Sequence, residues 1–396
     1  MTIEKLNSKR KIVLLTTSLG WGGTEGHVVD LALGFVKRGI YPTIVIDEPP
    51  LDRLSVLNEK GIQIILLSEK PWLSINEYRK KLKSTLESIK PDLIHINVWK
   101  RRNVILETAG KLNIPIVETI HATVPYKGKL WLFRHKLNIT RTPFADWKYS
   151  YLIKKYKPLI IHVSDLSANN FKKKYPFIKK TKRIYCGAYF PNDIKSIIDK
   201  DKVIVLWIGS MIKRKRPLLA LAIWKEITKD FSNAKLIMIG EGPQLEIVRK
   251  TAEKINSQKI MVIGSVPDLY PYLAKAHVML HTSTAEGIPK NIRYAMNFGL
   301  PTVSTNAGAI GEVLTDGKEG FLTKIEDSNQ IRKSLFNLIN DPELFSRMSK
   351  NAREKGRELF DMEKMINNVI ITYNEFYNLN INFQSLVSSN DIPLLD

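Results

Sequence analysis

The chain has 396 residues, which is long for one hydrophobic core and natural for two domains of about 150 to 200 residues each. Hydrophobic residues make up 44% of it, which argues against wholesale disorder, and a single cysteine, Cys186, excludes an intramolecular disulfide framework and a cysteine-based zinc site. The net charge of +22 favours anionic partners: phosphorylated substrates, an acidic membrane surface or nucleic acid.

Short β-rich apolar runs alternate with longer amphipathic segments, a pattern typical of βαβ units in a parallel sheet covered by helices. Strands of the first half are expected at residues 11–16, 42–46, 62–67, 93–97, 116–120 and 159–163. Those of the second half are expected at residues 203–209, 235–239, 260–264, 278–281 and 301–304. The sequence therefore predicts an α/β protein with two doubly wound halves.

Several helices have recognisable ends. A helix expected at residues 26–38 would stop at Gly39, and one at residues 328–340 would begin with Ser328 as its cap. A last helix is expected within residues 361–380, because its apolar positions recur at helical spacing.

The domain boundary is expected near the charged link at residues 190–202. This gives an N-terminal domain of residues 1–195, a C-terminal domain of residues 196–360, the last helix and a polar tail at 381–396.

Residues 125–157 mix basic and aromatic side chains with one acid, Asp146. This mixture suits a membrane interface, and it also fits a helical insertion whose aromatic residues pack in the core, or a surface that stacks nucleic acid bases. The apolar run at residues 12–15 is too short for an export signal, and no stretch approaches the length that spans a bilayer. We therefore expect a cytoplasmic protein whose contact with a membrane is peripheral.

Glycines follow the first expected strand in the stretch GWGGTEG at residues 20–26, where a backbone can approach a phosphate closely. Tight turns use glycine for steric reasons about as often. His121 ends the strand at 116–120, at the sheet edge where open α/β sheets bind ligands, and His95 ends another strand at the same edge. A structural histidine is the alternative in both cases.

A basic cluster, KRKR at residues 213–216, follows a strand and precedes a helix. The helix dipole disfavours cations at this end, so an anion such as a diphosphate would relieve the repulsion; a solvated basic turn is the alternative. Glu286 follows the strand at 278–281 and precedes a glycine-containing loop and a helix at 291–298. A carboxylate there can accept hydrogen bonds from sugar hydroxyls, or it can simply cap the helix.

Together these motifs resemble the retaining glycosyltransferases of family 4, also called group 1, which have the GT-B fold: two Rossmann-like domains whose parallel sheets face an interdomain cleft. The resemblance covers most of the chain and is most specific in EGIPKNIRYAMNFGLPTVSTNAGAIGEVLTDGKEGFL, which starts at Glu286. It also implies that the C-terminal helix packs back on the N-terminal domain.

The resemblance implies roles for individual residues. Lys215 would hold the donor diphosphate, His121 would contact the donor sugar or its phosphate, and Glu286 would bind hydroxyls of the transferred sugar. Further donor-site residues implied in this way are Gly22, Gly23, Ser210, Arg214, Arg216, Val266, Pro267, Gly287, Ile288, Pro289, Lys290, Asn291 and Tyr294.

Two positions depart from the family pattern. Tyr294 stands where the family usually has a second glutamate that grips the nucleotide ribose, and Ser210 stands where it commonly has an arginine. A phenol can still hydrogen-bond a ribose hydroxyl, and Arg214 or Arg216 can replace the missing charge; weaker donor binding is the alternative.

The resulting prediction is an enzyme that transfers a hexose, with retention, from a nucleotide diphosphate donor to a glycan or lipid-linked acceptor in cell-surface polysaccharide biosynthesis. No metal or cofactor is expected, since no Asp pair is clustered near the proposed diphosphate. The alternatives are a catalytically weak or inactive partner subunit and a sugar-nucleotide epimerase on the same fold. Nucleic acid is not an expected partner, because no recognition module is present.

Overall fold

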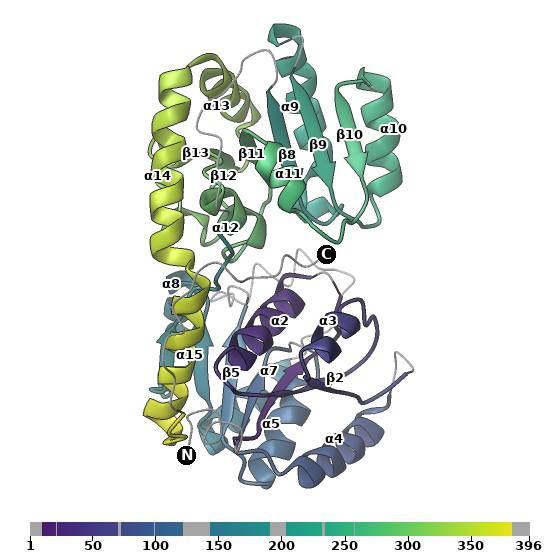
Figure 1. Ribbon diagram of the computed structural model, residues 1–396, viewed down its shortest axis with the longest axis vertical. Coiled ribbons are helices and arrows are strands. Elements are labelled where there is room, and N and C mark those ends of the chain that lie inside the picture. The colour runs from purple at the N-terminus through teal and green to yellow at the C-terminus, as the bar shows by residue number, and fades with distance from the viewer. Residues whose placement is uncertain are drawn as a thin grey trace. The chain divides into compact units, whose positions relative to one another are not determined.

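The computed structural model describes residues 10–20, 22–69, 73–98, 100–121, 143–190, 203–231, 234–256 and 258–381. These residues form two compact units (Figure 1). The first contains the described chain up to Cys186 and again from Glu363, and the second runs from Gly187 to Met362. The units therefore change at Gly187, whereas most of the link expected at residues 190–202 lies outside the described residues.

The first unit is built on a seven-stranded parallel sheet with the order β3-β2-β1-β4-β5-β6-β7. Its strands are β1 (Ile12–Thr16), β2 (Thr43–Ile46), β3 (Gln63–Leu66), β4 (Leu93–Ile96), β5 (Ile116–Ile120), β6 (Leu159–His162) and β7 (Thr181–Arg183). Its helices are α2 (Gly23–Val36), α3 (Leu54–Glu59), α4 (Ile75–Ile89), α5 (Arg102–Lys111), α7 (Pro143–Tyr156), α8 (Asp165–Lys174) and α15 (Met362–Tyr377). In the register of the central strands, Leu14 pairs with Ile44 on one side and with His95 on the other.

The second unit repeats the design with a six-stranded parallel sheet of order β10-β9-β8-β11-β12-β13. Its strands are β8 (Ile204–Ile208), β9 (Lys235–Ile239), β10 (Ile260–Ile263), β11 (Val278–His281), β12 (Thr302–Thr305) and β13 (Gly320–Thr323). Its helices are α9 (Pro217–Asp230), α10 (Leu245–Asn256), α11 (Tyr270–Lys275), α12 (Lys290–Asn297), α13 (Ser328–Asn340) and α14 (Pro342–Phe360), with short 3-10 turns at Lys213–Lys215 and Ile310–Glu312.

The predicted α/β class and the two doubly wound sheets are confirmed, and all eleven expected strands are present. Two strands were not expected: β7, which is only TKR in sequence, and β13. The cap of α13 is also different from the expected one. Asp327, rather than Ser328, accepts a hydrogen bond from the backbone N–H of Gln330.

The C-terminal helix α15 returns to the first unit, as expected. Tyr373 on this helix lies with its hydroxyl oxygen 2.6 Å from Nδ1 of His95 in β4. Arg38, after α2, donates to Glu363 at 2.6 Å, and the Tyr377 hydroxyl donates to the Ile116 carbonyl at 2.6 Å. The last helix is thus fixed to the first sheet by polar contacts as well as by its buried apolar face.

Of the basic aromatic segment at 125–157, residues 122–142 lie outside the described residues, and the described part forms α7. One face of α7 is in the core, where Tyr149 and Ile153 are buried and the Tyr149 hydroxyl donates to Glu118 at 2.9 Å. The opposite face exposes Trp147 and Tyr151. One side of α7 therefore packs its aromatic residue in the core, and the other side exposes aromatic residues at the surface. In the described parts of the chain, no helix is long and apolar enough to cross a bilayer.

Candidate functional site

The loops that the sequence singles out in the second unit leave neighbouring strands at one edge of the sheet. From β8 the chain continues to β9 and β10 on one side, whereas β11, β12 and β13 follow on the other side, so the strand order reverses between β8 and β11. In open α/β sheets, ligands bind beyond the carboxyl ends of the strands at such a reversal. The loop with the basic cluster follows β8, and the loop with Glu286 follows β11.

At this reversal, the carboxylate of Glu286 meets two cations of the preceding loop. Its Oε1 lies 2.5 Å from Nζ of Lys215 and 3.0 Å from Nη1 of Arg214. The side chains of Lys215 and Glu286 are only 13% and 8% exposed, whereas that of Arg214 is 45% exposed. The structure thus brings together the two residues to which the sequence gives diphosphate and sugar binding.

Burial and charge set the protonation of this cluster. Burial raises the pKa of Glu286, but the charges of Lys215 and its neighbours outweigh it and hold that pKa below its ordinary value. Burial lowers the pKa of Lys215, and the attraction of Glu286 only partly opposes this. The pair is therefore a carboxylate facing an ammonium group that has lost much of its hydration, and an ammonium group in this state interacts strongly with any anion that reaches it.

Hydrogen bonds join the two loops and fix the pair between them. The backbone N–H of Thr284 donates to the carbonyl of Arg214 at 2.9 Å. Thr282 donates from its hydroxyl to the Lys215 carbonyl at 2.8 Å, and its oxygen accepts from the indole N–H of Trp207 at 3.0 Å. Thr282 was not expected from the sequence, although a polar residue directly after an apolar strand is a signal for such a role.

Two glycines allow the loops to approach closely. Gly308 has a φ of +68°, and a Cβ at this position would lie 1.9 Å from the carbonyl oxygen of Glu286. Gly240 has a φ of +145°, and its Cβ would lie 2.0 Å from the carbonyl oxygen of Gly209. Any side chain at either position would push away the backbone of a site loop, because both contacts are to main-chain atoms.

The loop after Glu286 leads into α12, whose cap is Pro289. Gly287, Ile288, Pro289 and Lys290 are half-buried there. Asn291 donates from its side-chain amide to the Ile208 carbonyl at 2.6 Å and accepts from the backbone N–H of Ile292 at 2.8 Å. The side chain of Asn291 therefore anchors α12 to the end of β8. If Asn291 contacts a donor, it would do so through its backbone N–H at the start of the helix.

Tyr294 lies one turn further along α12. Its partly buried ring and Val266 pack against the same apolar cluster, which includes Phe298. Nζ of Lys290 lies 5.1 Å from the centre of the Tyr294 ring. Pro267, next to Val266, is exposed. Tyr294 and Val266 thus pack against one apolar cluster, although they are far apart in sequence.

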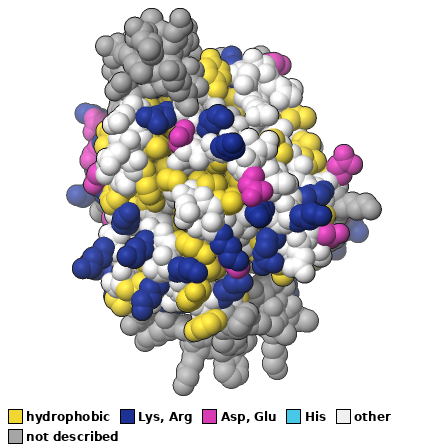
Figure 2. Space-filling model, turned by 90° about the horizontal axis from the view of Figure 1, so that it is seen from below, with side chains coloured by type: hydrophobic (Ala, Val, Ile, Leu, Met, Phe, Trp, Pro, Cys, Tyr) yellow, Lys and Arg dark blue, Asp and Glu magenta, His cyan; other side chains and the backbone are white. Residues whose placement is uncertain are grey.

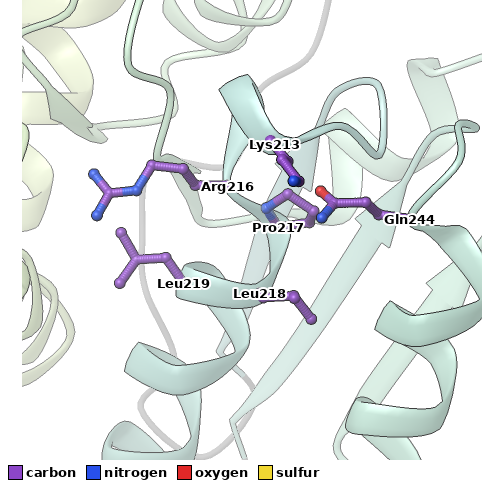
Figure 3. Close-up of a pocket in the computed structure, with 6 residues that line it drawn as sticks. All are labelled: Lys213, Arg216, Pro217, Leu218, Leu219 and Gln244. Atoms are coloured by element: carbon purple, nitrogen blue, oxygen red, sulfur yellow. The ribbon is translucent and has the colours of Figure 1, made fainter. Parts of the chain in front are cut away.

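Arg216 points away from Glu286. It has a left-handed backbone, with φ of 54°, and its guanidinium donates to the Ile325 carbonyl and lies 3.9 Å from Glu326. Ser210 is exposed. A pocket beside the start of α9 (Figure 3) is lined by Lys213, Arg216, Pro217, Leu218, Leu219 and Gln244. The cluster of four basic residues is therefore divided, with Arg214 and Lys215 at Glu286 and the other two at this pocket.

In the first unit, the strand order reverses between β1 and β4, and α2 begins directly after β1. Gly22 caps α2, and Gly23 is its first residue, three positions earlier than the expected start. The carboxylate of Glu25 folds over Gly22, where a Cβ would lie 2.1 Å from it, whereas a Cβ on Gly23 would meet open space. The glycine loop is thus at the edge where the sequence places it.

The two strand-end histidines have different surroundings. His121 is half-buried beyond β5, with Nε2 3.0 Å from Oδ1 of Asn97 and its ring 5.0 Å from that of His27. His95 is fully buried between Tyr373 and Thr119, each 2.6 Å from one of its ring nitrogens, and burial lowers its pKa to about 3. Of the two, His121 remains a candidate at the edge, and His95 is a structural residue of the core.

Two family models match the chain. The model for glycosyl transferases group 1 matches residues 191–355, and the model for glycosyltransferase family 4 matches residues 21–188. The chain belongs to the group 1 glycosyltransferases. The family predicted from the motifs is therefore confirmed, and so is the enzyme class.

Relatives of this glycosyltransferase align over most of its length. N-acetyl-alpha-D-glucosaminyl L-malate synthase of Bacillus anthracis is 22% identical over 356 residues, which span 87% of each protein. Alpha-monoglucosyldiacylglycerol synthase of Acholeplasma laidlawii is 24% identical over 358 residues, 83% of this chain and 88% of that protein. HepE of Anabaena, solved with UDP and glucose, superposes with a TM-score of 0.77 at 18% identity, over 93% of this chain and 100% of HepE. The predicted GT-B fold is thereby confirmed.

Proposed function

We propose that this group 1 glycosyltransferase moves a hexose, with retention, from a nucleoside diphosphate donor to a hydroxyl of a glycan or lipid-linked acceptor. The observation that carries the proposal is the buried pair of Lys215 and Glu286 at the reversal of the second sheet. The ammonium group of Lys215 suits a diphosphate, and the carboxylate of Glu286 suits sugar hydroxyls. The Anabaena protein HepE, which has this fold, was solved with UDP-glucose, and this supports a nucleotide sugar as the donor.

Lys215 and Arg214 would stabilise the leaving group. When the bond between the anomeric carbon and the donor phosphate oxygen breaks, negative charge accumulates on the departing diphosphate. An ammonium group that is 13% exposed and already held in place stabilises this charge more strongly than water does. With two cations fixed at this point, we expect transfer without a metal ion.

Glu286 would orient the sugar. Its pKa lies below the ordinary value, so it stays ionised at neutral pH and can only accept hydrogen bonds. As the donor binds, Lys215 would turn to the diphosphate and leave carboxylate oxygens for sugar hydroxyls. At the ligand edge of the first sheet, Gly22, Gly23 and the imidazole of His121 keep the roles that the resemblance implies for them, toward phosphate, donor sugar or acceptor.

The configuration of the anomeric carbon would be retained if the acceptor hydroxyl attacks this carbon from the same face of the sugar that the diphosphate leaves. The new bond forms between the acceptor oxygen and the anomeric carbon, the bond to the donor phosphate oxygen breaks, and the acceptor proton passes to the departing diphosphate. Glu286 is paired with two cations, which lowers the nucleophilicity of its carboxylate, so the proposal gives Glu286 no covalent step.

We also propose that α7 contacts an anionic membrane surface, where a lipid-linked acceptor would be found. Trp147 and Tyr151 are 64% and 51% exposed, one helical turn apart, with rings stacked 6.2 Å between centres. Nζ of Lys155, one turn further, lies 5.8 Å from the Tyr151 ring. Aromatic rings beside lysines are typical of a membrane interface. Figure 2 shows a face of the molecule on which Lys and Arg side chains are spread among hydrophobic ones.

A donor screen tests the proposed reaction. Purified protein is incubated with a panel of nucleotide sugars, and transfer and hydrolysis are both scored by mass spectrometry. We expect one class of donor to be consumed with formation of a nucleoside diphosphate. Binding without turnover would instead support a partner subunit that has lost activity, and a donor isomerised without loss of its diphosphate would support an epimerase.

A further inference from the structure

A buried histidine that the sequence did not single out lies directly behind the carboxylate of the donor site. His281 is the last residue of β11 and is 2% exposed. Its Nε2 lies 3.9 Å from Oε1 of Glu286 and 3.2 Å from the hydroxyl oxygen of Ser283. Its Nδ1 lies 3.1 Å from the hydroxyl oxygen of Ser304, on the neighbouring strand β12. Each ring nitrogen therefore has a hydroxyl partner, and one of them also faces the site.

The hydroxyl of Ser304 determines which ring nitrogen carries the proton. Its single hydrogen is donated to the carbonyl of Thr305 at 2.9 Å, and a carbonyl can only accept. Toward His281, the Ser304 oxygen is therefore the acceptor, so Nδ1 of His281 must be the donor. In a neutral imidazole with a proton on Nδ1, Nε2 has none and is itself an acceptor.

Nε2 is satisfied by Ser283, whose hydroxyl donates to it. Burial lowers the pKa of His281 to about 3, so the ring is neutral near pH 7. A neutral ring with an unprotonated Nε2 has no hydrogen to give to Glu286. The charged groups that face this ring are Glu286 itself and, beyond it, Lys215 and Arg214.

We propose that His281 is a positioning residue for Glu286, held by Ser304 in the tautomer that carries its proton on Nδ1. This tautomer withholds a hydrogen-bond donor from Oε1 of Glu286, so the carboxylate interacts with Lys215 and, once the donor is bound, with the sugar. The inference rests on the proposed role of Glu286 in donor binding.

The opposite tautomer shows why the choice matters. With its proton on Nε2, the ring would donate toward Glu286, whose Oε1 is near enough to close the contact with a small side-chain movement. The carboxylate would then be drawn toward β11 and away from Lys215. A donor sugar would lose part of its hydrogen bonding, and its affinity would fall without any loss of the fold.

The test combines histidine NMR with kinetics on the full chain. In protein labelled with ¹⁵N only at histidine, long-range ¹⁵N–¹H spectra report the tautomer of each ring, and the variant His281→Asn identifies the His281 signals by their disappearance. Ser304→Ala removes the acceptor for Nδ1–H, and Ser304→Thr keeps the hydroxyl. The matched control is Thr302→Val, because Thr302 is buried on the same strand and donates its hydroxyl to the Leu300 carbonyl instead.

We expect the wild type and Ser304→Thr to show protonated Nδ1 and unprotonated Nε2 at His281. In Ser304→Ala the signals should shift toward protonated Nε2, and the KM for the donor should rise roughly fivefold with a smaller change in kcat. Thr302→Val should leave the tautomer of His281 and the KM for the donor unchanged. Protonated Nε2 in the wild type overturns the proposal, as does a Ser304→Ala variant with the wild-type tautomer and KM. If the wild type turns over no donor, the proposed function fails, and the tautomer still decides this inference.

Discussion

Nζ of Lys215 lies 2.5 Å from Oε1 of Glu286, across the two strands between which the order of the second sheet reverses. Each of these side chains is nearly buried, and each is the main neutralising partner of the other. Under the proposed function, a donor would replace this contact with an anion for Lys215 and hydroxyls for Glu286. A free sugar would supply only the hydroxyls, so we expect recognition to require a molecule that carries both groups.

The loop of Glu286 depends on Gly308. We expect Gly308→Ala to lower the free energy of unfolding by about 3 kcal/mol or more, because an alanine would add both a strained positive φ and a clash with the Glu286 carbonyl. Gly317 is a matched control, since its φ is +77° and a Cβ there meets nothing within 4 Å. Gly317→Ala should cost only about 1 kcal/mol. Urea unfolding and donor KM measure the two variants, and equal effects of both would argue against the packing explanation.

The acid stability of the protein should be governed by buried histidines. Burial lowers the pKa of His95 and of His281 to about 3 and that of His162 to about 4. Because these folded-state values lie below the ordinary 6.5, the unfolded chain binds more protons below pH 6.5, and stability falls as the pH drops. Asp47 has the opposite effect on stability, because burial raises its pKa to about 6. As the pH falls, the folded chain binds this proton at a higher pH than the unfolded chain does.

Between pH 6 and pH 4 these four groups alone take up about two protons on unfolding, which lowers the free energy of unfolding by roughly 3 kcal/mol per pH unit. Urea unfolding at pH 6, 5 and 4 measures this dependence. In His95→Asn, one of the titrating groups is gone, so the pH dependence should be shallower by about one proton even though the variant is less stable overall. A dependence as steep as that of the wild type would show that His95 does not contribute.

Tyr294 should affect donor affinity through both its ring and its hydroxyl. Tyr294→Glu would place a carboxylate beside Lys290 and remove an aromatic ring from the apolar cluster, so we expect a changed donor affinity or a changed choice among nucleotides. Tyr294→Phe removes the hydroxyl alone and keeps the ring. If the hydroxyl contacts the ribose, Tyr294→Phe should weaken donor binding by about three- to tenfold in calorimetry. Donor affinities unaltered in both variants would place this residue outside the donor site.

Membrane contact by α7 can be measured by sedimentation with vesicles that contain anionic lipid. Replacing Trp147 and Tyr151 with serine should reduce the bound fraction, with a loss of affinity of about tenfold or more, because both rings are exposed. Adding salt should weaken the binding of the wild type, since lysines contribute. Ile247→Ser is the control, because Ile247 is 52% exposed on a helix of the second unit. If the α7 variant sediments like the wild type, the proposed contact is wrong.

Much of the fold could be predicted because the central strands are buried on both faces and therefore contain continuous apolar runs such as IVLL and LIMI. The strand β7 could not be predicted in this way, since TKR is an edge strand with no apolar run. Both His95 and His121 were predicted to lie at the ligand edge of the sheet, because each ends an expected strand. Its actual partner, Tyr373, is 278 positions away on α15, and no local pattern indicates such a contact.

The sequence predicted which residues form the candidate site, but it did not predict which of them are in contact. The rule that ligands bind beyond the carboxyl ends of parallel strands brought Lys215 and Glu286 to one edge. It could not say which of four consecutive basic residues would face Glu286. That depends on a 3-10 turn at Lys213–Lys215 and on the left-handed backbone of Arg216, which sends the guanidinium to the Ile325 carbonyl. The contacts of Thr282 with the Lys215 carbonyl and of His281 with Ser304 depend on the tertiary structure.

The most direct test of the central claim is the rate of donor turnover after the removal of one charge. Lys215→Met keeps most of the side-chain volume and removes the ammonium group beside Glu286, and Lys213→Met is the matched control because it removes an exposed charge from the same turn. With the donor that the wild type consumes, we predict that Lys215→Met lowers kcat/KM by about 100-fold or more, and that Lys213→Met stays within about threefold of the wild type. A Lys215→Met enzyme that transfers sugar as fast as the wild type would contradict the account.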